Sequence, residues 1–217
     1  ADGLAMLNLV LPVYGVIYAI GSMIGIGSAT RYGINRAKGE DTDDYFLQSF
    51  FFSILFSIPF MLTGFLAPQK FLGLLGADAK LAALGKSYLR IILTASPLFM
   101  ANYTFTAFAR NDQATSVAMT ASIAGSLFNI VFDYILMFPC GLGLAGAALA
   151  TAVCPAVTML ICGIHYLGRK NTVGFHWKRP GFSHLISCCK MGISAFVGEI
   201  SSAVITIVFN MLILGSG

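Results

Sequence analysis

Six long apolar runs constrain this chain more than any other feature of its sequence. About 20 consecutive apolar residues span a bilayer as a helix, and a helix satisfies its own backbone hydrogen bonds in lipid. The runs lack the short apolar-polar alternation that is typical of barrel strands. We therefore predict an all-α polytopic membrane protein with six transmembrane helices. The expected spans are residues 4–30, 45–67, 88–110, 114–138, 143–167 and 187–214.

The composition agrees with a membrane protein. The chain is 57% hydrophobic and only 10% charged, whereas soluble domains contain about 25% charged residues. The net charge of +4 resides in short clusters between the apolar runs, so it gives no reason to expect a nucleic-acid partner. The cysteines form no CxxC or Cys/His pattern and are interpreted as small buried hydrophobes. They are Cys140, Cys154, Cys162, Cys188 and Cys189.

The distribution of Lys and Arg predicts the orientation. Nine of the 13 basic residues lie in or beside connectors 31–44, 111–113 and 168–186. The positive-inside rule places these connectors in the cytoplasm of a multi-pass plasma-membrane protein, with both ends of the chain on the outer side. Connector 68–87 is amphipathic, and we expect a short interfacial helix there.

An ionisable residue interrupts the fourth apolar run. Ser122, Ser126, Asn129 and Asp133 are spaced four, three and four apart, so they share one helix face. Carboxylates at membrane depth are costly and usually line a pathway. Asp133 is therefore predicted to take a proton or Na⁺ on a face that points into the bundle. The alternative is a structural hydrogen bond to a neighbouring helix.

The sixth run repeats this pattern. Glu199, Ser202, Thr206 and Asn210 also share a helix face. Glu199, with Asn210 on the same face, is predicted to meet a cationic substrate or a second ion. An interhelical hydrogen bond is the alternative.

The first run combines aromatic and small residues. Tyr14 and Tyr18 share a face with Gly21 and Gly25. Aromatic faces attract cations, so the tyrosines are candidates for holding a flat, lipophilic cation, with simple packing as the alternative. Gly21 and Gly25 form a GxxxG match, which favours a tight helix contact.

No enzyme signature occurs in the chain. The sequence contains no GxSxG, P-loop, HExxH or Rossmann fingerprint. His165, His176 and His184 have no metal-ligand spacing, so we assign them no role. We expect no catalytic activity, no cofactor and no metal other than a possible Na⁺.

Two stretches resemble the multidrug and toxic compound extrusion (MATE) family. The more specific one is "FARNDQATSVAMTASIAGSLFNIVFDYILMFPCGLGLAGAALATA", residues 108–152, with its N-x-x-x-D and G-A-A-x-A-T motifs. The other is "LPVYGVIYAIGSMIGIGSATRYGINRAKGE", which resembles the second family helix and its following turn.

The resemblance implies a twelve-helix transporter of two bundles, of which this chain supplies helices two to seven. Residues 1–167 would belong to the N-terminal bundle, 168–186 to the cytoplasmic linker, and 187–217 to the first helix of the C-terminal bundle. The chain begins and ends at apolar runs, and we expect it to be an internal piece of a longer protein.

The resemblance also implies an ion site and an activity. Its ligands would be Asn129, Asp133, Thr151 and the Ala147 carbonyl, and Glu199 resembles an acid on the seventh helix of some members. The implied function is a secondary antiporter, active as a monomer when full length, that exports amphipathic, often cationic compounds against H⁺ or Na⁺. The alternatives are a lipid-linked oligosaccharide flippase of the same superfamily, which should carry a cationic cavity, and a non-transporting membrane scaffold.

Overall fold

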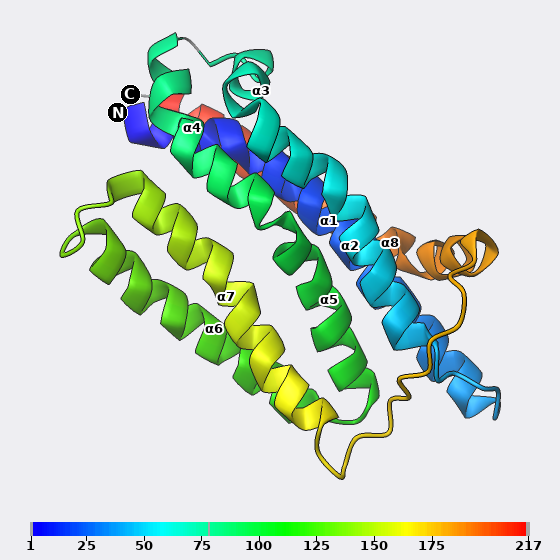
Figure 1. The fold of residues 1–217 in the computed structure, drawn as a ribbon. Coiled ribbons are helices and arrows are strands. Elements are labelled where there is room, and N and C mark those ends of the chain that lie inside the picture. The colour runs from blue at the N-terminus through cyan, green and yellow to red at the C-terminus, as the bar shows by residue number, and fades with distance from the viewer. Residues whose placement is uncertain (1, 78, 216–217) are drawn as a thin grey trace.

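The computed structural model describes residues 2–77 and 79–215, with side chains described for residues 6–77 and 79–209. This part of the chain is built of α-helices joined by short turns and one longer linker, and it contains no strand (Figure 1). The helices are α1 (Asp2–Ala37), α2 (Tyr45–Leu66), α3 (Pro68–Leu74), α4 (Ala79–Thr94), α5 (Ser96–Asn111), α6 (Thr115–Met137), α7 (Gly143–Tyr166) and α8 (Phe182–Gly215).

The six predicted spans are confirmed by length and composition in the described residues. Helices α4 and α5 together form the third span, and the chain breaks between them at Ala95, two residues before Pro97. Proline restricts the residue before it and lacks an N–H, which accounts for a break at this position. Helix α3 is the short helix expected in the second connector.

Several helices extend beyond their apolar runs. Helix α1 continues to Ala37, α4 begins at Ala79, and α8 begins at Phe182, so the irregular linker is shorter than predicted and covers residues 167–181. Hydropathy marks only the apolar part of a helix, whereas the helix continues through polar residues until a glycine or proline interrupts it.

Helix α1 lies at the centre of the fold and packs against α5 through the predicted glycines. A Cβ atom on Gly21 would lie 2.9 Å from Met100 Cα, and one on Gly25 would lie 2.6 Å from the Thr104 nitrogen. Real Cβ atoms do not approach this closely, so both positions require glycine. The tight contact predicted from the GxxxG match is therefore confirmed.

Helices α6 and α7 form an antiparallel pair beside this central group (Figure 1). Their turn contains Gly141 at φ +66° and Gly143 at φ +51°, a left-handed conformation that glycine adopts without steric cost. Helix α7 packs on both α5 and α4, so the pair joins the rest of the fold along one side. A cavity lies where α1, α5, α6 and α7 meet.

Helix α8 packs along α1, after the linker has crossed one end of the bundle (Figure 1). A Cβ atom on Gly192 would overlap the backbone of Met23, which shows how closely the two helices approach. We call the end that carries residues 38–44, 112–114 and 167–181 the basic end of the bundle, because most of the Lys and Arg residues lie there.

Candidate functional site

The cavity between α1, α5, α6 and α7 has a volume of about 190 Å³. It gathers polar side chains from four helices that are far apart in the sequence. Its lining includes Tyr18, Asn102, Tyr103, Asn129, Thr151 and Pro155. Three of the predicted site residues, Tyr18, Asn129 and Thr151, therefore lie around one space.

Three buried polar atoms at this site have no hydrogen-bond partner among the described residues. They are Asn102 Oδ1, Asn129 Nδ2 and Asp133 Oδ1. Nearly all buried polar atoms in folded proteins are paired, so each exception requires an explanation. Unpaired oxygens at a cavity are suited to a bound cation, a proton or water.

Asp133 lies one helical turn from Asn129 and is half-buried, but it does not line the cavity. Its carboxylate interacts electrostatically with the hydroxyl groups of Tyr14 and Tyr88. Those two hydroxyls are 3.1 Å apart and hydrogen-bond each other. Tyr14 thus lies toward Asp133, while Tyr18, one turn further along α1, lines the cavity itself.

Helix α7 contributes oxygens through an interrupted backbone. Pro155 has no N–H to donate, so the carbonyl of Thr151, four residues earlier, has no donor within the helix. Thr151 lines the cavity, so its hydroxyl and this carbonyl both belong to a residue of the site. Ala147 lies one turn earlier on α7 and is half-buried, but it does not line this cavity.

Glu199 of α8 accepts a hydrogen bond of 2.8 Å from the Tyr103 hydroxyl of α5. This contact is the interhelical hydrogen bond that the sequence left as an alternative role for Glu199. It also brings the acid next to the cavity, because Tyr103 lines it. Sequence reasoning missed Tyr103, whose only signal was its position beside Asn102.

The remaining polar residues of the two predicted faces do not reach the cavity. Ser122 and Ser126 are exposed and donate to carbonyls one turn back, so of the expected inward face of α6 only Asn129 lines the cavity, and only Asn129 and Asp133 are partly buried. Ser202 and Thr206 of α8 are also exposed. The side chain of Asn210 lies outside the described residues.

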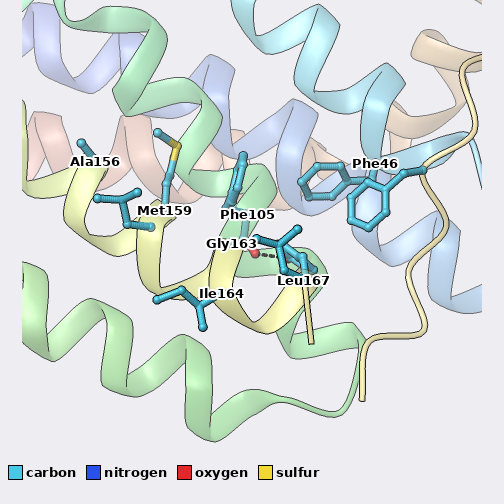
Figure 2. Close-up of a pocket in the computed structure, with 10 residues that line it drawn as sticks. Phe46, Phe105, Ala156, Met159, Gly163, Ile164 and Leu167 are labelled. Atoms are coloured by element: carbon cyan, nitrogen blue, oxygen red, sulfur yellow. Dashed lines mark hydrogen bonds between the residues drawn. The ribbon is translucent and has the colours of Figure 1, made fainter. Parts of the chain in front are cut away.

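A larger cavity lies elsewhere and is apolar. It has a volume of about 720 Å³ and lies between α2, α5, α7 and the linker, around Phe105 and Met159 (Figure 2). Its lining has almost no polar atoms, so it does not suit an ion. Within the described residues, no group of three or more His, Cys, Asp or Glu side chains is placed to hold a metal.

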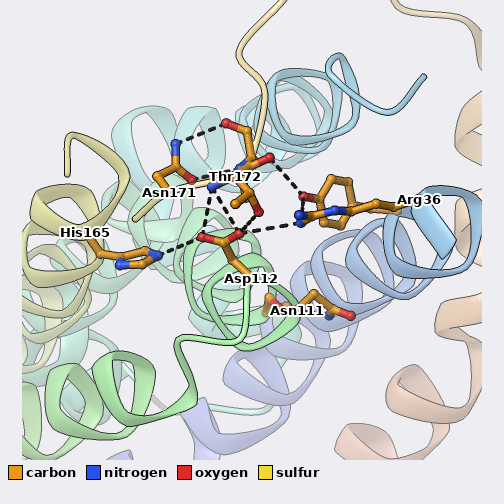
Figure 3. Close-up of polar contacts among 9 residues, drawn as sticks. Arg36, Asn111, Asp112, His165, Asn171 and Thr172 are labelled. Atoms are coloured by element: carbon orange, nitrogen blue, oxygen red, sulfur yellow. Dashed lines mark hydrogen bonds and ion pairs between the residues drawn. The ribbon is translucent and has the colours of Figure 1, made fainter. Parts of the chain in front are cut away.

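A second polar cluster lies at the basic end, and sequence reasoning missed it (Figure 3). The fully buried Asp112 carboxylate contacts His165 Nε2 at 2.8 Å and Arg36 at 3.6 Å. It also accepts hydrogen bonds from the backbone nitrogen and the hydroxyl of Thr172. We call Arg36, Asp112, His165 and Thr172 the linker clamp, because they tie the linker to α1, α5 and α7.

Helices long and apolar enough to cross a membrane, packed around an internal polar cavity, indicate a multi-pass membrane protein. The family model MatE matches residues 1–135. The chain belongs to the MatE family, as its resemblance implied.

Curated relatives are multidrug export proteins. The multidrug export protein MepA of Staphylococcus saprophyticus is 28% identical over 222 residues, covering 99% of this chain and 48% of that protein. MepA of Staphylococcus aureus is 29% identical over 225 residues, with the same coverage of both chains. The chain thus spans about half the length of the curated relatives it matches.

Solved structures share the fold. An inward-facing multidrug resistance MATE family transporter superposes with a TM-score of 0.85 at 23% identity, covering 94% of this chain and 47% of that one. The MATE multidrug transporter DinF-BH, solved as a complex, has a TM-score of 0.83 at 25% identity, covering 100% of this chain and 49% of the other.

Proposed function

We propose that this chain is part of a secondary antiporter that exports amphipathic, often cationic compounds against an inward flow of H⁺ or Na⁺. The observation that carries the proposal is the Asp133 carboxylate, whose buried Oδ1 has no partner among the described residues and which lies one turn from Asn129, whose amide nitrogen Nδ2, a donor, is also unpaired. Membership of the MatE family and the multidrug export relatives support it.

The site divides into an ion part and a substrate part. A cavity of about 190 Å³ is smaller than the roughly 300–1,000 Å³ that drug-sized ligands occupy. It is suited to an ion that Asn129 and Thr151 contact from the lining, with Asp133 one turn further along α6 and Ala147 one turn earlier on α7, both outside the lining. The substrate needs more surface, and Tyr14, Tyr18 and Glu199 offer aromatic faces and a negative charge for a flat cation.

Ion and substrate compete through the conformation of the bundle. A proton or Na⁺ at Asp133 neutralises a carboxylate that is otherwise costly inside the membrane. Binding therefore favours whichever packing of the helices encloses the neutralised group. The shift in population is limited to the difference in ion affinity between the two packings. In this proposal the basic end faces the cytoplasm, as the positive-inside rule requires.

The test is efflux of a fluorescent cation from vesicles that contain the full-length protein. Asp133→Asn removes the titratable and cation-binding oxygen while keeping the volume, and ion-driven efflux should be abolished. Glu40→Gln, an exposed acid in a connector, is the matched control and should transport like the native protein.

Full efflux by the Asp133→Asn variant would refute the proposal. If the native protein shows no ion-driven flux and Asp133→Asn only lowers the stability of the protein, the chain is a scaffold rather than a transporter. A lipid-linked oligosaccharide flippase should carry a cationic cavity, and neither Lys nor Arg lines the cavity described above.

A further inference from the structure

The apolar cavity of about 720 Å³ is a groove at the basic end of the bundle (Figure 2). Phe46 of α2, Phe105 of α5 and Met159 of α7 form its wall, and Phe175 of the linker closes one side. The one polar group nearby, the Tyr166 hydroxyl, is already used as a donor to the Phe105 carbonyl. The groove therefore offers a ligand only apolar contacts.

The groove opens sideways, away from the helix bundle. Leu160, Ile164 and Leu167 follow one another at four- and three-residue spacing along α7, so they form a single stripe. Their side chains are 69%, 71% and 91% exposed. The stripe and the groove beside it are covered by no described residue, and they lie on a helix that has the length and hydropathy of a membrane span.

Three basic residues lie within five positions of residues that line the groove, namely Leu167 and Phe105. Arg169 and Lys170 follow the end of α7, and Arg110 is in the last turn of α5; all three are exposed. Asp112 is buried in the linker clamp, and Asp43 is paired with His176.

We propose that this groove binds an anionic phospholipid from the leaflet at the basic end. One acyl chain lies against Phe105, Met159 and Phe175, and the phosphate of the headgroup lies near Arg169 and Lys170. Basic pockets between transmembrane helices recognise anionic headgroups in this way. This acyl chain contacts both the helices and the linker, so the bound lipid also holds the linker in place. This inference does not depend on the export proposed above.

Gly163 provides the means to fill the groove. A Cβ atom there would meet no other atom within 4 Å, although the residue lies in the lining. Gly163→Leu should therefore occupy the groove without displacing the protein. Gly198 of α8 is equally open and lies outside the groove, which makes Gly198→Leu the matched control.

The experiment is native mass spectrometry of the full-length protein in detergent, titrated with phosphatidylglycerol or with phosphatidylcholine of the same acyl chains. The native protein should retain phosphatidylglycerol in preference to phosphatidylcholine. Gly163→Leu should lose the retained lipid, and Gly198→Leu should keep it.

Charge removal tests the headgroup contact. The double variant Arg169→Gln, Lys170→Gln should bind phosphatidylglycerol roughly fivefold more weakly for each charge removed. The control pair Lys70→Gln, Lys86→Gln at the opposite end should bind like the native protein. The proposal is overturned by unchanged phosphatidylglycerol retention in Gly163→Leu, or by equal retention of the two lipids in the native protein.

Discussion

At the scale of single residues, the site combines satisfied and unsatisfied polar atoms. Asp133 Oδ1 and Asn129 Nδ2 are buried without a partner among the described residues, whereas Glu199 is held by Tyr103 at 2.8 Å. An unpaired buried polar atom costs about 1–3 kcal/mol. A ligand that pairs with such an atom offsets this cost. The difference separates two acids that look alike in the sequence: Asp133 has a buried oxygen without a partner, and one Glu199 oxygen accepts a hydrogen bond from Tyr103.

Tyr103→Phe should lower the stability of the full-length protein by about 1–3 kcal/mol, because it leaves the Glu199 oxygen without its donor. Thermal unfolding in detergent measures this effect. Tyr134→Phe is the control, since that side chain is 64% exposed and its hydroxyl reaches solvent or lipid headgroups. Equal shifts in the two variants would show that the Tyr103–Glu199 bond does not stabilise the fold.

At the scale of the helix, α7 lacks one backbone hydrogen bond at Pro155. Pro155 leaves the Thr151 carbonyl without an intrahelical donor at the edge of the cavity. Hard cations are bound by carboxylate, amide and carbonyl oxygens, so this carbonyl complements Asp133 and Asn129. A proton needs only the carboxylate.

Pro155→Ala should weaken Na⁺ binding by about tenfold, or about 1.4 kcal/mol, because the new N–H occupies the Thr151 carbonyl. The measurement is the rise in melting temperature of the full-length protein on adding NaCl, compared with choline chloride. Pro59→Ala in α2, which lies away from the cavity, should leave the Na⁺ effect unchanged. An undiminished Na⁺ effect in Pro155→Ala would show that the Thr151 carbonyl does not bind Na⁺, and the absence of any Na⁺ effect in the native protein would leave the proton as the coupling ion.

At the scale of the whole molecule, the linker clamp joins segments from most of the chain. The buried Asp112 carboxylate connects α1, α5, α7 and the linker, and it does so from the turn between α5 and α6. A second attachment lies further along, where Lys178 contacts Asp41 at 2.7 Å, but both side chains are largely exposed. Exposed ion pairs contribute little, so the buried carboxylate should dominate.

Asp112→Ala should therefore raise the hydrogen-exchange rate of the Thr172 amide by at least about tenfold, since a hydrogen bond to a charged group contributes roughly 1.5–3 kcal/mol. Asp41→Ala should change it little. Exchange is measured by mass spectrometry on peptides that cover residues 168–176 of the full-length protein. The reverse ranking would assign the linker's position to the surface pair.

The pH dependence of the surface attachment follows from the contact between Lys178 and Asp41. The hydrogen bond from Lys178 lowers the pKa of Asp41 from its ordinary value of 3.8, and the same contact raises the pKa of Lys178. For a carboxyl with a lowered pKa, the stabilisation is present above its ordinary value and is lost as the pH falls through the lowered one. At neutral pH the Lys178–Asp41 pair is therefore intact. Hydrogen exchange in Asp112→Ala and Asp41→Ala should be compared at that pH, so that each variant removes a contact that the native protein makes.

The sequence by itself determined the six membrane-length helices and the shared helix face of Asn129 and Asp133. Apolar length and helical spacing are local properties, so the six spans, the GxxxG contact and the proximity of Asn129 to Asp133 could all be predicted from consecutive residues. The extra turns at Ala37 and Phe182 could not, because hydropathy does not register polar residues that continue a helix.

Only the tertiary structure decided which of these polar residues meet. Tyr103 and Glu199 are separated by 96 positions, and Asp112 and Thr172 by 60. The groove around Phe105 likewise draws its wall from α2, α5, α7 and the linker. Periodicity places a residue on a helix face, but the neighbour of that face depends on how the helices pack. That packing is decided by close approaches such as Gly25 against Thr104, which no single stretch of sequence contains.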